Sequence, residues 1–373
     1  MARTTANGCF RFAPPFLASI AAGNGTDLAG IGVAVAVSEL SGLLSPLLGE
    51  VVERLTRRAA MALGLLGVGL ATGLAAASVH PVMFAVAVVI LAQSKVMFDL
   101  GLGSWVSDRV PFERRGRVIG ITETSWALGL LLGVSAMGLV TAAAGWRVGY
   151  AVGAVAVVAL SGLVLRLVPD EQAAHAVATR PARVPVRWRP IAPFLLGMFC
   201  LMGSSQALFV TFGSWLEDDF GFTAAALSAV AFGMGLGELF SSLMSARVAD
   251  RRGKERSAAL GGVVMVPAAL ALVWLHPTAW IGLPLLAVAI AGFEFGIVSA
   301  IPLGTTIVAG SPARGMALML GAGTFGRAAT SIPATRLYDA HGMGAAAALS
   351  AALALATALV FHRLPVGRAS TRS

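Results

Sequence analysis

Twelve apolar runs, each about 20 residues long, constrain the fold of this 373-residue chain more than any other feature. A helix needs about 20 mostly apolar residues to cross the hydrocarbon core of a membrane. Only α-helices and closed β-barrels satisfy all backbone hydrogen bonds in lipid, and barrel strands are far shorter than these runs. The sequence therefore predicts an all-α membrane protein with twelve transmembrane helices. The expected spans are residues 8–24, 29–49, 59–78, 82–104, 117–141, 147–168, 191–213, 223–246, 257–276, 279–304, 315–335 and 343–363.

The composition supports the same class. Charged residues make up 12% of the chain and hydrophobic residues 57%, whereas a water-soluble domain carries about 25% charged residues. The net charge of +9 comes mostly from basic residues between the apolar runs, where the anionic inner face of a membrane explains them better than nucleic acid does. Cys9 and Cys200 lie in different halves of the chain without metal-ligand spacing. We expect no disulfide, no metal and no nucleic-acid partner.

The N-terminal run resembles a signal peptide in having Arg3 and Arg11 ahead of small apolar residues. Pro14 and Pro15 interrupt the run, and a second span follows at once. A retained first helix is therefore expected.

Orientation follows from the basic residues of the short loops, which concentrate on the cytoplasmic side. The loops after the even-numbered spans hold Arg54, Arg57, Arg58, Arg109, Arg114, Arg115, Arg180, Arg183, Arg187, Arg189, Arg251, Arg252, Lys254, Arg314, Arg363 and Arg368. The alternate loops are poor in arginine and lysine. We therefore expect a multi-pass protein of the plasma membrane with both termini in the cytoplasm.

Several features recur after nearly 200 residues, which indicates that the chain contains one unit twice. Glu53 and Asp250, each in a charged loop after an apolar run, lie 197 residues apart. The other recurring pairs are His80-Pro81 with His276-Pro277, Arg115-Gly116 with Arg314-Gly315, Glu39 with Glu238, and Lys95 with Glu294. We expect two six-helix halves, residues 1–168 and 191–373, joined by an extended cytoplasmic linker at residues 169–190.

The charged loops carry a family resemblance. The stretch Ala249-Asp250-Arg251-Arg252-Gly253-Lys254 resembles the signature that the major facilitator superfamily has after its second helix. The first copy keeps an opening Gly49 but has Glu53 in place of aspartate and Thr56 in place of glycine. In that family the loop helps to hold one conformation. The resemblance therefore implies a conformational latch, whose residues would be Gly49, Glu53, Arg54, Asp250, Arg251, Gly253 and Lys254.

Three further stretches resemble the same family. Residues 108–117 are similar to its second internal loop, and Gly145-Trp146-Arg147 is similar to its turn between the fifth and sixth helices. Residues 129–134 are similar to a glycine-rich motif of antiporters, although that motif has proline where Val134 stands. Overall the chain resembles the twelve-helix drug/proton antiporters, which implies two pseudo-symmetric halves that work by alternating access.

Ionisable residues inside the expected spans are the candidates for proton coupling or substrate binding. Near a helix centre each such charge costs roughly 2.5–3.5 kcal/mol, so these side chains must face the bundle interior, pair with one another or be neutral. Their formal sum is negative, and burial in an apolar environment raises the pKa of a carboxylate towards the range where it exchanges protons at neutral pH. The seven residues are Glu39, Lys95, Asp99, Glu123, Glu238, Glu294 and Arg327.

Each of these candidates also has a structural interpretation. Lys95 and Asp99 are four residues apart and can pair on one helix face, as a lock or as part of the pathway. Glu39 and Glu238 occupy matching spans, where either can titrate or serve as a hydrogen-bonded structural acid. Glu123 lies close enough to the Arg114–Arg117 cluster to pair with it. Arg327 can bind an anionic group or hold one of the acids.

The leading functional hypothesis is a secondary transporter that exports a small organic molecule in exchange for protons. The acidic interior suits proton exchange and cationic substrates. Proton-driven nutrient uptake and uncoupled facilitated transport are the alternatives. The acidic run at residues 217–219 has no partner cluster, and no nucleotide-binding P-loop is present, which argues against an enzyme and against ATP as the energy source. A non-transporting receptor would not need so many interior charges. We expect no cofactor and a functional monomer.

Overall fold

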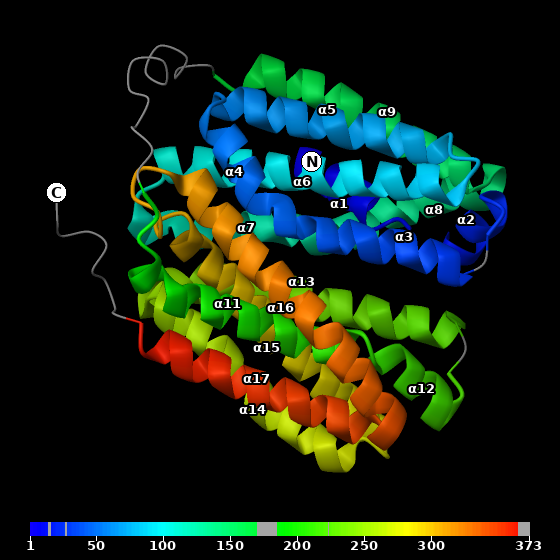
Figure 1. Ribbon diagram of the computed structural model, residues 1–373, viewed down its shortest axis with the longest axis vertical. Helices are drawn as coiled ribbons and strands as arrows, with labels where there is room; N and C mark the ends of the chain where they lie inside the picture. The colour runs from blue at the N-terminus through cyan, green and yellow to red at the C-terminus, as the bar shows by residue number, and fades with distance from the viewer. Residues whose placement is uncertain (14–15, 27, 170–184, 223, 365–373) are drawn as a thin grey trace. The chain divides into compact units, whose positions relative to one another are not determined.

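The computed structural model describes residues 1–13, 16–26, 28–169, 185–222 and 224–364, and these residues form helices joined by short turns (Figure 1). In the N-terminal part the segments are α1 (Ala2–Phe10), α2 (Leu17–Gly23), α3 (Leu28–Leu40), the 3-10 helix η2 (Ser41–Leu44), α4 (Ser45–Glu53), α5 (Arg57–Ala76), α6 (Pro81–Arg109), α7 (Phe112–Leu128), the π-helix η3 (Gly129–Val134), α8 (Ser135–Ala144) and α9 (Trp146–Leu167). In the C-terminal part they are α11 (Trp188–Phe209), α12 (Phe212–Phe220), α13 (Ala224–Arg252), α14 (Lys254–Leu275), α15 (Ala279–Gly304), α16 (Pro312–His341) and α17 (Met343–His362).

Taken in chain order, the described helices make the twelve predicted spans. Four of the spans consist of more than one segment: α1 with α2, α3 with η2 and α4, α7 with η3 and α8, and α11 with α12. Among the described residues, nine helical stretches are long and apolar enough to cross a membrane by length and composition. The expected start of the first span at residue 8 was wrong, because α1 already begins at Ala2.

The two copies begin equivalent helices in related ways. Gly145 and Gly342, 197 residues apart, stand directly before α9 and α17 with φ angles of 88° and 73°. This backbone region is open to glycine and strained for other residues. Gly253 stands directly before α14 in the same way, with a φ angle of 91°. At the matching place before α5, Thr56 is extended and its side chain accepts the Ala59 N–H at 3.1 Å, so a side-chain cap replaces the glycine.

The described residues group into two compact units. Unit 1 comprises Met1–Arg109, Ser125–Pro185 and Val308–Leu318, and unit 2 comprises Val110–Thr124, Val186–Ile307 and Met319–Ser373. Two short segments, 110–124 and 308–318, are therefore grouped with residues of the other predicted half. The predicted linker falls mostly on residues 170–184, which lie outside the described residues together with Arg180, Arg183 and Arg368. The predicted division of the chain at this linker stays a prediction.

Each unit has its own buried core. In unit 1, helices α5, α6 and α9 pack against one another, and Phe12 contacts Tyr150 edge to face with ring centroids 4.5 Å apart. In unit 2, α14 packs on α15 and α17, and α17 packs on α11 (Figure 1). Gly64 and Gly261, again 197 residues apart, let the neighbouring helices approach: a Cβ there would lie 2.6 Å from Phe98 N and 2.5 Å from Gly296 Cα. The repeat is thus present in the helix packing as well as in the charged loops.

Candidate functional site

The two acids of the predicted latch lie in helices rather than in loops as expected, Glu53 at the end of α4 and Asp250 in the last turn of α13. Each binds the N-terminal part of a distant helix. In unit 1, Glu53 Oε1 accepts the Ala313 N–H near the start of α16 at 2.7 Å. In unit 2, Asp250 accepts the N–H groups of Gly116 and Arg117, near the start of α7, at 2.9 and 2.8 Å. A carboxylate is favourable here because helix N-termini expose N–H groups and carry partial positive charge. Ala313 and Gly116 are themselves 197 residues apart, so the two contacts are equivalent under the repeat.

A basic side chain contacts each of the two acids, Glu53 and Asp250. Arg57 lies 3.4 Å from Glu53 and donates from Nε to Asp108 at 3.0 Å. Lys254 is buried, contacts Asp250 at 2.9 Å, and lies 4.3 Å from the centre of the Phe112 ring. Such charge-assisted contacts hold the carboxylates in place.

The remaining predicted latch residues divide into packing and surface positions. Gly49 lies against α16, where a Cβ would come within 2.6 Å of Ala317 Cβ, and Gly253 starts α14 with its positive φ. Arg54 and Arg251 are exposed. The structure thus brings Glu53, Asp250 and Lys254 into hydrogen-bonded contacts, and their role as a latch stays a prediction.

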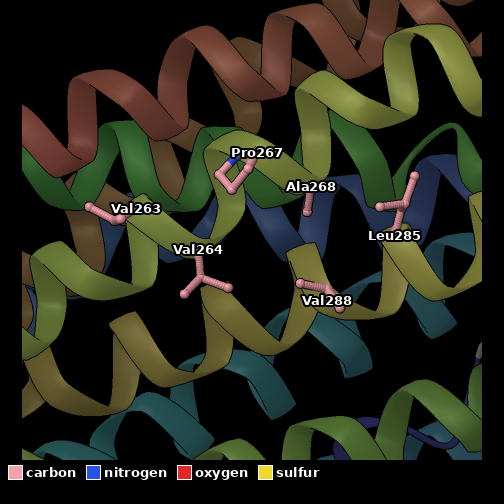
Figure 2. Close-up of a pocket in the computed structure, with 6 residues that line it drawn as sticks. All are labelled: Val263, Val264, Pro267, Ala268, Leu285 and Val288. Carbon is pink, nitrogen blue, oxygen red and sulfur yellow. The ribbon is translucent and has the colours of Figure 1, made fainter.

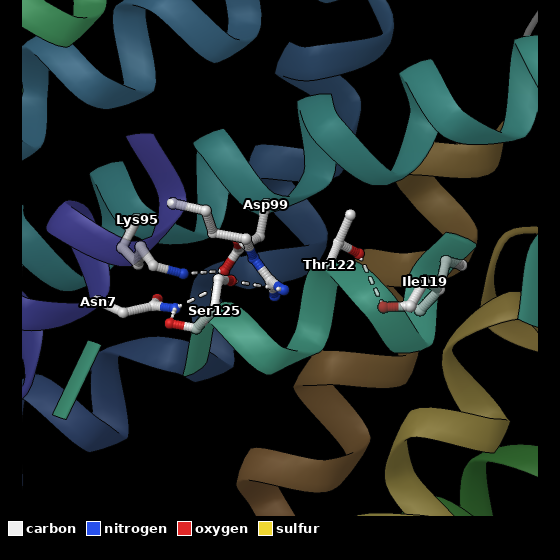
Figure 3. Close-up of polar contacts among 7 residues, drawn as sticks. Asn7, Lys95, Asp99, Ile119, Thr122 and Ser125 are labelled. Carbon is white, nitrogen blue, oxygen red and sulfur yellow. Dashed lines mark hydrogen bonds and ion pairs between the residues drawn. The ribbon is translucent and has the colours of Figure 1, made fainter. Parts of the chain in front are cut away.

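A polar cluster in unit 1 joins α1, α6 and the end of α7 (Figure 3). Lys95 binds Asp99 Oδ2 one turn along α6, as predicted from their spacing, and Arg3 Nε binds Asp99 Oδ1 at 3.0 Å. Asn7 is fully buried and donates to the Ser125 carbonyl at 2.9 Å. Two cations on one carboxylate stabilise its ionised form. Asp99 is therefore better suited to holding charge than to releasing and rebinding a proton.

Arg3 and Asn7 were missed in the sequence analysis. The expected first span began at residue 8, which placed both residues ahead of the membrane; since α1 begins at Ala2, their side chains reach α6 and α7. Arg11 directly follows α1, and its guanidinium lies 4.7 Å from the centre of the Trp126 ring. The signal for this placement was the helical spacing of Arg3, Asn7 and Arg11, four residues apart along one face.

Buried acids characterise unit 2. Glu294 on α15 is 6% exposed and accepts a hydrogen bond from the Ser242 hydroxyl of α13 at 2.7 Å. Glu238 is 5% exposed and precedes Ser242 by one turn on the same helix. Ser245 and Ser299 make a second hydroxyl contact between these helices at 3.0 Å. A carboxylate that meets a hydroxyl can keep that contact with or without a proton, because a hydroxyl both donates and accepts.

Arg327 on α16 meets a residue that the sequence analysis did not single out. Its Nε donates to Gln206 Oε1 on α11 at 2.9 Å, and Gln206 Nε2 donates to Ser331 at 3.0 Å. Gln206 is 7% exposed, whereas Arg327 is half-buried. An uncharged amide inside an apolar run gives little signal in sequence, which explains why Gln206 was missed.

Glu39 and Glu123 differ from these acids in their surroundings. Glu39 is exposed on α3, and Glu123 is half-buried on α7. Lys95 and Glu294, which occupy matching places in the repeat, lie in different units. The predicted attraction between them therefore stays a prediction.

Two surface hollows lie away from these polar clusters. One of about 490 Å³ lies between α14 and α15 and is lined by apolar side chains (Figure 2): Val263, Val264, Pro267, Ala268, Leu285 and Val288. Another of about 520 Å³ lies at the start of α11, beside Arg187, Trp188, Arg189 and Pro190. The first has no polar side chain in its lining to orient a solute, and neither includes a predicted site residue.

Comparison with known proteins decides the family. Residues 4–335 match the Major Facilitator Superfamily. The chain belongs to the major facilitator superfamily. It is therefore a multi-pass membrane protein of a transporter family, with the twelve-helix architecture of two six-helix halves that is typical of this superfamily.

Individual relatives add less detail. The chain is 28% identical over 182 residues to the uncharacterized MFS-type transporter YwfA of Bacillus subtilis (strain 168), a match that covers 43% of this chain and 41% of that relative. Because the match spans about two fifths of YwfA, the whole protein's activity does not follow from it.

The fold is similar to that of several solved transporters. The human organic anion transporter MFSD10 gives a TM-score of 0.77 at 20% identity, with 96% of this chain and 97% of that chain covered. The E. coli fucose:proton symporter FucP gives 0.75 at 15% identity, with 98% and 96% covered. A bacterial homologue of the iron transporter ferroportin gives 0.78 at 15% identity, with 97% and 96% covered. At these identities the likeness concerns the fold alone.

Proposed function

We propose that this protein is a secondary active transporter that exports a small organic molecule in exchange for protons by alternating access. The proposal of proton coupling is supported by the buried carboxylate of Glu294, which accepts a hydrogen bond from the Ser242 hydroxyl. A charge at this depth is costly, so an acid there gains by taking up a proton in one state of the cycle. Asp99, bound by Lys95 and Arg3, stays ionised and serves as a structural or substrate-binding group.

The two acids at the ends of α4 and α13 supply the conformational part of the proposal. Glu53 and Asp250 each hold a helix start that is distant in sequence, 260 and 134 residues away. Contacts of this kind stabilise one arrangement of the helices and must break when the carrier changes state. Gly49, Arg54, Arg251, Gly253 and Lys254 support these loops, through close packing, positive charge and the turn into α14.

Other parts of the proposal rest on the distribution of charge. The arginine-rich loops after the even-numbered spans favour the plasma membrane with both termini in the cytoplasm. Glu39, Glu238, Glu123 and Arg327 remain candidates for proton or substrate binding. We expect the monomer to be the functional unit.

The test of proton coupling separates exchange from net transport. Purified protein in liposomes with an internal pH-sensitive dye would be given a panel of amphipathic solutes. In Glu294→Gln, we expect solute-for-solute exchange at close to the wild-type rate, because exchange needs no net proton movement, and loss of proton-driven accumulation. Glu217→Gln, which changes an exposed acid that is not a candidate site residue, is the matched control.

Two outcomes would contradict the proposal. Solute movement without proton flux in the wild type would exclude coupling and favour a facilitator. Proton-driven accumulation that survives in Glu294→Gln would remove Glu294 from the mechanism. The sign of the flux decides direction: protons entering as solute leaves means export, whereas co-movement means the alternative, proton-driven uptake, as in the relative named a fucose:proton symporter.

A further inference from the structure

Pro46 interrupts the helix of the second span. In a continuous α-helix the Gly42 carbonyl would accept the N–H of residue 46, but proline has no N–H and its ring would clash with that carbonyl. The carbonyl instead accepts the backbone N–H of Ser45, as in a 3-10 helix, and the Ser45 hydroxyl at 2.5 Å. The short segment η2 between α3 and α4 therefore follows from the proline, and the Gly42 carbonyl is satisfied without an α-helical hydrogen bond.

The part of the span before η2 is bound to α6. The Ser38 hydroxyl donates to the Val88 carbonyl at 3.2 Å, and Gln93 Nε2 donates to the hydroxyl oxygen of Ser41 at 2.6 Å. Ser41 in turn donates to the Ser38 carbonyl at 2.6 Å. Because Ser38 and Ser41 are buried, these hydrogen bonds hold the end of α3 and the start of η2 on α6.

The part of the span after η2 is bound to a different element. Glu53 at the end of α4 accepts the Ala313 N–H at 2.7 Å, and Glu50 lies 4.0 Å from Arg314, both near the start of α16. The segment η2 thus lies between an attachment to α6 and an attachment to α16. A displacement of the start of α16 relative to α6 is taken up most readily at this point, where a 3-10 turn interrupts the α-helix.

A small bend at η2 is enough to open the Glu53 contact. From Ser45 to Glu53, α4 is about 12 Å long at 1.5 Å per residue, so a rotation of about 10° moves Glu53 by about 2 Å. A hydrogen bond of 2.7 Å that lengthens by this amount is broken. In the second copy α13 is continuous from Ala224 to Arg252 and contains no proline, so Asp250 lies on a stiffer support.

We propose that η2 is a hinge of the second span, built by Pro46 and held on α6 by Gln93, which opens the Glu53 contact while α3 stays in place. The Asp250 contact of the second copy opens with a movement of the whole of α13. This inference rests on the proposed latch and goes beyond it, because it makes the two acid contacts mechanically unequal.

Pro46→Ala tests the hinge by restoring the missing N–H. With an α-helical hydrogen bond to the Gly42 carbonyl, α3 and α4 become one continuous helix. Hydrogen–deuterium exchange of the detergent-solubilised full chain should then slow about fivefold or more in residues 308–318, which contain the Ala313 N–H. Residues 112–120, which contain the N–H groups bound by the second acid, should keep the wild-type rate.

Pro267→Ala is the matched control, because it likewise restores an N–H inside a membrane helix, α14. It should leave exchange in residues 308–318 unchanged. Equal slowing in this control and in Pro46→Ala would overturn the inference, since it would show general stiffening of the protein. Unchanged exchange of residues 308–318 in Pro46→Ala, or equal slowing of residues 112–120, would overturn it as well.

The Ser45 hydroxyl gives a second test that does not depend on exchange rates. Ser45→Ala removes a donor to the Gly42 carbonyl and should lower the thermal unfolding midpoint by about 2–4 °C. In the Pro46→Ala background the new N–H satisfies that carbonyl, so the same substitution should lower the midpoint by about half as much or less. Equal losses in the two backgrounds would show that Pro46 does not interrupt the helix at Gly42, and the hinge would be wrong.

Failure of the hinge differs from failure of the proposed latch. If Glu53→Ala speeds exchange in residues 308–318 and Pro46→Ala leaves it unchanged, the latch stands and the hinge is wrong. If neither variant changes exchange there, both are wrong.

Discussion

At the scale of single residues, Asp99 and Glu294 show two kinds of contact that a carboxylate inside a span can make. Asp99 lies between two cations, Lys95 and Arg3, with the Arg3 contact at 3.0 Å. Glu294 meets the hydroxyl of Ser242 at 2.7 Å. An ion pair stabilises the charged carboxylate, whereas a hydroxyl tolerates either protonation state. The same functional group, a carboxylate, is therefore suited to two different tasks in the two units.

The Asp99 pair gives a prediction about stability. In Asp99→Asn, Lys95 and Arg3 lose the negative charge that compensates them, and Lys95 is only 4% exposed. Removing one partner of a buried ion pair typically costs about 3 kcal/mol or more. We expect a clearly lower thermal unfolding midpoint in detergent, with Asp99→Glu recovering most of it. A midpoint for Asp99→Asn equal to that of Glu39→Gln would contradict the ionised pair.

At the scale of helices, side chains from elsewhere in the chain satisfy the exposed backbone groups at helix ends. Arg147 donates to the carbonyls of Gly23, the last residue of α2, and of Ser78, just after the end of α5, both at 2.7 Å. Such a cation is favourable near helix C-termini, which carry partial negative charge. Glu53 and Asp250 do the reverse near the N-termini of α16 and α7. Backbone groups at helix ends in each unit are thus bound by side chains of complementary charge from other helices.

The two acid contacts can be measured separately by hydrogen–deuterium exchange. In Asp250→Ala we expect faster exchange in residues 112–120, while residues 308–318 keep the wild-type rate. In Glu53→Ala the pattern should be reversed. Loss of a cap worth about 1 kcal/mol corresponds to roughly fivefold faster exchange where local opening limits it. Unchanged exchange in both segments would rule out the contacts, and equal changes in both would show that they open together.

At the scale of the whole molecule, the duplication is visible in backbone geometry. Gly145 and Gly342 adopt similar positive-φ conformations before α9 and α17. Gly64 and Gly261 occupy equivalent close approaches between neighbouring helices. The acid contacts at Ala313 and Gly116 follow the same offset of 197 residues. Equivalent positions in the two copies should therefore respond to mutation in the same way.

That equivalence predicts matched effects of alanine substitution. Gly145→Ala and Gly342→Ala should each destabilise the protein by about 1–3 kcal/mol, because a side chain is strained at these φ angles. No atom lies within 4 Å of a Cβ at either glycine, so the cost is conformational rather than steric. Gly162→Ala is the control, since its surroundings are equally open and its φ is ordinary. Thermal unfolding midpoints would check this; a loss confined to one copy would contradict the equivalence.

The sequence by itself determined the number and type of the spans, because the length of an apolar run and the cost of charge in lipid are properties of local sequence. It also determined the Lys95–Asp99 pair, since four residues make one helical turn. The repeat followed from Glu53 and Asp250, whose spacing is independent of folding.

Only the tertiary structure decided which distant groups meet. Arg3 reaches Asp99 because α1 begins earlier than the apolar run indicates, and Gln206 reaches Arg327 because α11 packs against α16 at that height. For the same reason, the sequence did not indicate that Ser242 is the hydrogen-bond partner of Glu294. These contacts depend on the rotation and depth of each helix. Rotation and depth are set by the side-chain packing of neighbouring helices, which apolar runs of nearly uniform composition do not specify.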